Sequence, residues 1–148
     1  MTNTCTARAS SKATLWAGLL SLVLAGCVDD TASYLIDGSK EHTIMLRRVQ
    51  DWFWQDTVAL TIAASRLPEC HGGIDIEDVP RSARPELYQA PPEYAEPIYI
   101  LKIEDRHYAI STQSCRVQAF GEPPLDLGAL LGVFKEADGK FRFEPKTG

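Results

Sequence analysis

The segment from Thr57 to Arg66 alternates between apolar side chains and small or polar ones along its whole length. Every second residue is apolar and falls on one face: Val58, Leu60, Ile62 and Ala64. Because successive side chains of a strand point to opposite faces, this period of two predicts a half-buried β-strand. Such a strand needs partners and a cover for its apolar face, so the segment points to a fold built on sheets.

The preceding segment, from Thr43 to Trp54, is also predicted to be a strand, because β-branched and aromatic residues gather near its ends. Gln55 and Asp56 would form a tight turn that joins the two segments as a hairpin. A helix is the competing interpretation, since five large apolar residues also fit helical spacing: Met45, Leu46, Val49, Trp52 and Phe53. The pattern favours the strand and leaves the helix open.

Two further hairpins are predicted nearer the C-terminus. One runs from Ile98 to Val117 around the polar turn Glu104–His107. The other runs from Leu131 to Phe143 around Asp138-Gly139, a pair that tight hairpin turns favour. Between them, Leu125–Leu131 is expected to form a helical turn or two.

Residues 68–97 are expected to form a long loop, because six prolines and a Gly-Gly pair interrupt them. A connection of that length inside a small domain is usually functional or poorly ordered. Strands dominate the remainder. The expected fold class is therefore mainly β: a small antiparallel sheet that forms a sandwich or partial barrel, with little helix outside the N-terminal signal.

The first 26 residues are predicted to be a secretory signal that is removed from the mature protein. Residues 1–14 are polar, with Arg8 and Lys12 as their only charges, and residues 15–25 are apolar. A positive region, a short apolar run and small residues before a cleavage point are the parts of such a signal. The apolar run is too short for an ordinary membrane span, although a short anchoring helix is the competing interpretation.

The sequence at the cleavage point, Leu24-Ala25-Gly26-Cys27, resembles the lipobox of bacterial lipoproteins. The resemblance covers the signal alone. It implies that Cys27 is joined to diacylglycerol, becomes the N-terminal residue and is acylated on its amine, with palmitate among the expected acyl groups. Two or three acyl chains hold a protein stably on a membrane where one does not. In that family an aspartate after the cysteine retains the protein in the inner membrane, so Val28 favours the outer membrane, facing the periplasm.

The four cysteines of the chain divide into distinct roles. Cys5 leaves with the signal and Cys27 takes the lipid, so Cys70 and Cys115 remain. Two cysteines in an exported, oxidising compartment most often form a disulfide. A metal or redox pair is the rival interpretation, but neither cysteine has a ligand-like spacing. The bridge would restrain the base of the proline-rich loop.

The mature chain is expected to consist of a lipidated N-terminus with a flexible tether over residues 27–41, followed by a single β-rich domain over residues 42–148. Without Arg8 and Lys12, the counts of 15 basic and 20 acidic residues become 13 and 20, a net charge of −7. An acidic body repels phosphate backbones, which argues against a nucleic-acid partner.

No catalytic residue, metal site or cofactor is predicted. His42 and His107 are isolated, and neither has ligand spacing. His71 follows Cys70, but the second cysteine of a haem-attachment motif is missing. The acidic run Asp75-Ile76-Glu77-Asp78 does not have the alternation and central glycine of an EF-hand.

The run Trp52-Phe53-Trp54 is the most unusual local feature. On a strand, Trp52 and Trp54 would share one face, and large aromatic side chains usually fill the core. The competing interpretation is an exposed aromatic platform that binds a glycan or a protein partner.

Two classes of function follow from these observations. The leading hypothesis is a non-enzymatic envelope lipoprotein, attached to membrane lipid through Cys27, that binds another envelope component or serves as an accessory module. The alternative is a periplasmic hydrolase or small-ligand-binding protein that uses His71, Asp75 and Glu77 in the long loop. A deep pocket that joins His71 to an acid or a hydroxyl group would support the alternative.

Overall fold

A computed structural model describes residues 27–148 and contains two antiparallel sheets, as the mainly β expectation requires. The four-stranded sheet has the order β1-β2-β3-β4, and the six-stranded sheet has the order β10-β9-β5-β6-β7-β8. Neither sheet closes into a barrel. The strands are β1 (Asp29–Leu35), β2 (His42–Val49), β3 (Thr57–Arg66), β4 (Cys70–Pro80), β5 (Glu86–Gln89), β6 (Ile98–Ile103), β7 (Arg106–Ser111), β8 (Val117–Ala119), β9 (Ala129–Ala137) and β10 (Lys140–Pro145).

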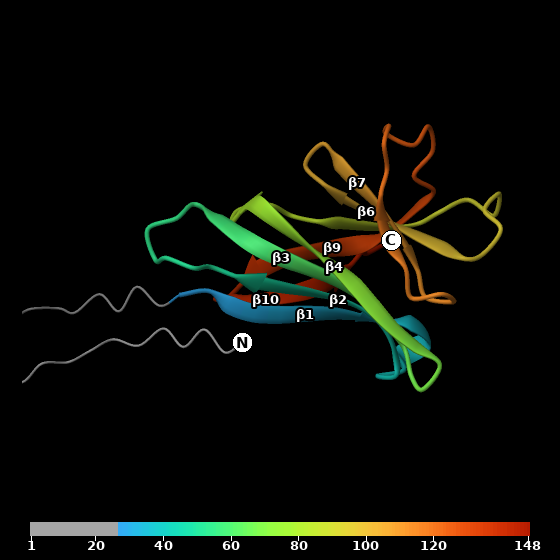
Figure 1. Ribbon diagram of the computed structural model, residues 1–148, viewed down its shortest axis with the longest axis horizontal. Coiled ribbons are helices and arrows are strands. Elements are labelled where there is room, and N and C mark those ends of the chain that lie inside the picture. The colour runs from blue at the N-terminus through green and yellow to red at the C-terminus, as the bar shows by residue number, and fades with distance from the viewer. Residues whose placement is uncertain (1–26) are drawn as a thin grey trace, which may run out of the picture.

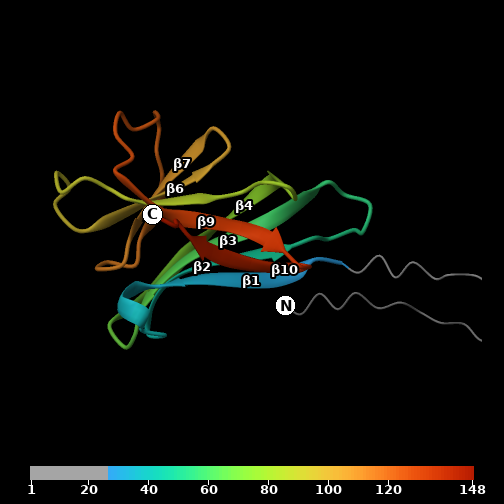
Figure 2. The same cartoon turned by 180° about the vertical axis from the view of Figure 1, so that it is seen from behind.

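The core lies between the two sheets, which pack with β1 beside β10 at one edge (Figures 1 and 2). At the other edge β4 lies beside β8. Both sheets contribute fully buried side chains, among them Ile44, Leu46, Leu60, Ile62, Leu87, Leu101, Ile103, Ile110 and Phe134. Every strand and every core residue in the described part of the chain falls within residues 28–145. The chain from residue 28 onward is therefore the folding unit.

The flexible tether expected over residues 27–41 is wrong for most of its length. Residues 29–35 form β1, which pairs with β2 from Asp29↔Val49 to Leu35↔Thr43, and Ile36–Gly38 follow as a 3-10 turn. Ala32 is the one buried residue of β1, and Val28 and Ile36 are buried on either side of it. An edge strand with a single buried alanine resembles a tether in composition, so its partner strand decides its structure.

The predicted strand at Thr43–Trp54 exists but is shorter, and the helical interpretation is wrong. β2 ends at Val49, and residues 50–56 form the loop to β3. β3 begins and ends where the alternation predicts, at Thr57 and Arg66.

The long loop expected over residues 68–97 contains two strands, β4 and β5. In β4 the glycines fit the sheet: a Cβ on Gly72 would collide with the carbonyl oxygen of Cys115, and one on Gly73 with that of Ile62. The acidic residues of β4 lie on its exposed face. A loop-like composition thus belongs to a paired strand, because glycine is required where another backbone approaches closely.

The two C-terminal hairpins are confirmed as β6–β7 and β9–β10, the latter with Asp138 and Gly139 at positive φ in its turn. The helical turn expected over Leu125–Leu131 is wrong. β9 already begins at Ala129, and Gly128 before it has a φ of 80°, a left-handed conformation that ends any helical run.

Candidate functional site

The three aromatic side chains of the loop between β2 and β3 are exposed, which overturns the expectation that they fill the core. The exposed fractions are 56% for Trp52, 57% for Phe53 and 63% for Trp54. The two indole rings stack on each other with centroids 5.1 Å apart and planes 19° apart, and Phe53 meets Trp54 edge-on at 4.8 Å. We call residues 50–56 the aromatic loop.

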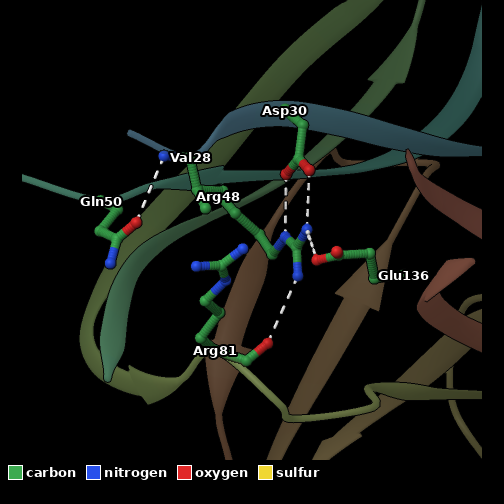
Figure 3. Close-up of polar contacts among 6 residues, drawn as sticks. All are labelled: Val28, Asp30, Arg48, Gln50, Arg81 and Glu136. Carbon is green, nitrogen blue, oxygen red and sulfur yellow. Dashed lines mark hydrogen bonds and ion pairs between the residues drawn. The ribbon is translucent and has the colours of Figure 1, made fainter. Parts of the chain in front are cut away.

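Gln50 fixes the aromatic loop to Val28, the residue that precedes β1 (Figure 3). The Gln50 side chain is buried, and its Oε1 accepts a hydrogen bond from the Val28 backbone N–H at 3.3 Å. The backbone N–H of Gln50 donates to the Val28 carbonyl at 2.8 Å. The side-chain Nε2 of Gln50 donates to the Gln55 backbone carbonyl at 2.6 Å, across the loop. The loop is therefore held beside Cys27, which is itself exposed.

Replacing Gln50 by alanine is expected to loosen the aromatic loop and lower the free energy of unfolding by about 1–3 kcal/mol, because buried backbone groups lose their partners. Hydrogen exchange of the amides of residues 52–56 should rise more than that of β6. Equal protection of the loop in both proteins would contradict this role. Gln118→Ala, at an exposed glutamine of β8, is the control.

A hollow of about 530 Å³ lies beside the aromatic loop. Its lining includes Phe53 and Trp54 together with four charged residues, Asp56, Arg81, Arg84 and Glu136. Both arginines are exposed, and neither guanidinium has a hydrogen bond or ion pair within the described part of the chain. The hollow thus combines apolar rings with two guanidinium groups and two carboxylates, those of Asp56 and Glu136.

Arg48 lies near the aromatic loop and is held by polar contacts with both sheets (Figure 3). Its side chain is 5% exposed. The guanidinium donates two hydrogen bonds to Asp30 at 2.7 and 2.8 Å and one to Glu136 at 3.2 Å, and it stacks 4.0 Å above the Phe141 ring. Burial lowers the pKa of Arg48, but the two carboxylates outweigh it and the net pKa is raised. One side chain thereby connects β1 and β2 of one sheet to β9 and β10 of the other.

His71 does not lie in a long loop but on the exposed face of β4. Its Nδ1 is 2.6 Å from the Ser65 hydroxyl, and Asp75 further along the same face accepts a hydrogen bond from Thr61 at 2.6 Å. Two strand residues four positions apart are separated by about 13 Å, so Asp75 does not support His71. His71 lines neither the hollow at the aromatic loop nor the second hollow described next.

A second hollow, of about 630 Å³, is lined by the loop between β5 and β6, which lies at the opposite end of the molecule from the aromatic loop (Figure 1). The loop between β5 and β6 forms most of its wall, with Pro91, Pro92 and Tyr94, and Tyr99 lies at its edge. Burial, followed by the nearby Tyr34 and Asp37, raises the pKa of Tyr99. This hollow contains no basic residue.

The expected disulfide between Cys70 and Cys115 is present, with Cα atoms 5.8 Å apart. Its place differs from the expectation, because Cys70 begins β4 and the proline-rich loop does not start there. Cys115 lies between β7 and β8, so the bridge joins the edge of one sheet to the edge of the other. It does so at the far end of β3 and β4 from the aromatic loop.

The predicted signal, with Leu24, Ala25 and Gly26 of the lipobox-like sequence, lies outside the described residues. Over residues 27–148 there is no group of three or more histidine, cysteine or acidic side chains placed to hold a metal ion. The same part of the chain contains no helix with the length and apolar character to cross a bilayer. No family model matches the chain, and neither does a curated protein or a solved structure.

Proposed function

We propose that this protein is an envelope lipoprotein, anchored through an acylated Cys27 in the outer membrane and facing the periplasm. The observation that carries the proposal is the position of Cys27. It is exposed, completes the lipobox-like sequence and precedes the first buried residue, Val28, by one position. Cleavage before Cys27 would leave the folding unit of residues 28–145 intact.

The domain would serve as a non-enzymatic binding or accessory module. The exposed aromatic loop supports a role in binding, because monomeric proteins seldom expose large apolar side chains as one patch. The hydrolase alternative has less support. Its only close pair is Ser65–His71 on an open strand face, and a nucleophile and base of this kind need a third group that orients the histidine.

Labelling of producing cells with radioactive palmitate tests the anchor. The wild-type protein is expected to carry label and to fractionate with the outer membrane. Cys27→Ser should carry none and should retain the signal, which makes the protein about 26 residues longer. Cys5→Ser is the matched control, because it removes a cysteine from the signal and should be labelled normally. Palmitate label on the Cys27→Ser protein, or a wild-type protein without label, would contradict the proposal.

A further inference from the structure

The aromatic loop lies at the end of the domain where the anchor would leave it. Gln50 pairs with Val28, and Trp52 follows Gln50 by only two residues, a stretch that spans at most about 7 Å. Figures 1 and 2 show the loop and the start of β1 pointing in the same direction. Acyl chains on Cys27 would therefore bring a bilayer surface directly to the aromatic loop.

We propose that Trp52, Phe53 and Trp54 insert into the headgroup region of the bilayer that holds the anchor. Arg81 and Arg84 would contact lipid phosphates from the neighbouring hollow. This inference rests on the proposed anchor. Tryptophan is enriched at membrane–water interfaces because its ring is apolar and its N–H is polar. Arginine, whose planar fork binds phosphate with two hydrogen bonds, completes the arrangement.

The geometry of the rings favours a bilayer over a glycan. A sugar stacks on the open face of an aromatic ring, but Trp52 and Trp54 each cover one face of the other and Phe53 abuts Trp54. The loop presents a compact apolar tip, and a bilayer accepts such a tip without complementary shape. Its position beside the anchor favours the bilayer over a separate protein.

The charged residues around the aromatic loop determine how much the contacts between arginine and lipid phosphate can add to membrane binding. Asp56 lines the hollow together with Arg81 and Arg84, and Asp51 of the loop is also exposed, while Glu136 is already paired with Arg48. The rings are therefore expected to supply most of the binding, and the arginines to add a preference for anionic lipid that salt weakens.

Attachment through both the lipid on Cys27 and the inserted aromatic loop would also fix the orientation of the domain relative to the membrane. β3 runs from Thr57 beside the aromatic loop to Arg66 beside the disulfide, and ten strand residues span roughly 30 Å. The disulfide and the hollow formed by Pro91, Pro92 and Tyr94 would then face away from the membrane. That end is where a soluble envelope partner could reach an accessory module.

Tryptophan fluorescence tests the insertion directly. Of the three tryptophans, Trp16 is in the signal, so Trp52 and Trp54 are the only two in the mature chain. Lipidated protein in phosphatidylcholine vesicles with bromine on the acyl chains near the headgroup should show blue-shifted, quenched emission. Protein that is anchored but unquenched would overturn the inference while the anchor stands. An unlabelled Cys27 in the palmitate experiment would instead remove the anchor, so the two failures are distinguishable.

Sedimentation of residues 28–148 with vesicles measures the contribution of each group without the lipid anchor. Trp52→Ala/Trp54→Ala should lower binding at least about tenfold, because two large apolar side chains no longer leave water. Leu67→Ala/Tyr94→Ala is the matched control, since it removes two exposed apolar side chains away from the loop. Equal loss in the control pair would contradict a specific role for the aromatic loop.

The arginines are tested with vesicles that contain phosphatidylglycerol. Arg81→Gln/Arg84→Gln should lower binding about fivefold at low salt, and should lower binding to pure phosphatidylcholine, whose headgroup has no net charge, by a smaller factor. Arg66→Gln/Arg116→Gln changes the net charge equally at the disulfide end and should have little effect. Equal effects of the two pairs would overturn the phosphate contacts. Emission that responds to peptidoglycan fragments or to an envelope protein, and not to brominated lipid, would assign the loop to that partner instead.

Discussion

Replacing Arg48 by alanine is expected to lower the free energy of unfolding by about 3 kcal/mol. The substitution leaves the carboxylates of Asp30 and Glu136 without their cation, and removing one member of a buried pair is far more costly than never having formed the pair. The estimate is at the low end for such pairs, because the side chains of Asp30 and Glu136 remain 31% and 40% exposed and keep part of their hydration. Loss of the stacking on Phe141 adds to the effect.

Denaturant unfolding at neutral pH measures this loss, and the adjacent Arg47 supplies the control. Arg47 also forms a two-pronged pair, with Asp29, but both partners are largely exposed. Arg47→Ala should therefore cost only a small fraction of the Arg48→Ala loss. Arg48→Lys should fall between wild type and Arg48→Ala, because lysine keeps the charge but cannot bind Asp30 with a planar fork. Equal losses at positions 47 and 48 would contradict the assignment.

Removing the disulfide by Cys70→Ala/Cys115→Ala is expected to cost about 4 kcal/mol. The bridge closes a loop of 45 residues, and in the chain-entropy account a loop of that size restricts the unfolded chain by about this amount. The loss is a large share of the stability of a small domain. Because the bridge ties β4 to the segment between β7 and β8, it also restrains the edges of the two sheets.

Unfolding of the wild-type protein with and without reductant checks the same quantity. With reductant, wild type should match the double variant to within about 1 kcal/mol. Labelling of native protein with a thiol reagent, without reductant, should leave Cys70 and Cys115 unmodified. Modification of both residues under those conditions would disprove the bridge in solution.

The strands that local pattern predicts correctly are those whose own residues satisfy the rules of a hairpin. β3 alternates apolar and small residues over its full length, and Asp138-Gly139 supplies the positive φ values that a tight turn needs. β1 and β4 were missed for the opposite reason. Their burial comes from a partner strand, so β1 with its single buried alanine and β4 with its glycines resemble loops when taken alone.

The candidate site was found only in part. The run Trp52-Phe53-Trp54 is conspicuous, but its expected place in the core was wrong, because β2 ends at Val49 before the aromatic residues begin. The Arg48 network was missed altogether. A signal for it exists in the paired runs Asp29-Asp30 and Arg47-Arg48, which antiparallel pairing of β1 with β2 brings together.

The sequence by itself determined the mainly β class, the two C-terminal hairpins and the pairing of Cys70 with Cys115. These follow from periods of two residues, from turn chemistry and from elimination among four cysteines. The signal and the acylation of Cys27 stay predictions from the same source.

Only the tertiary structure decided which features meet. Val28 and Gln50 are 22 positions apart and Arg48 and Glu136 are 88 apart, so no local pattern places them in contact. Strand order and register do so, because they are set by burial of both sheets at once. The same packing puts the aromatic loop beside Cys27 and the disulfide at the opposite end.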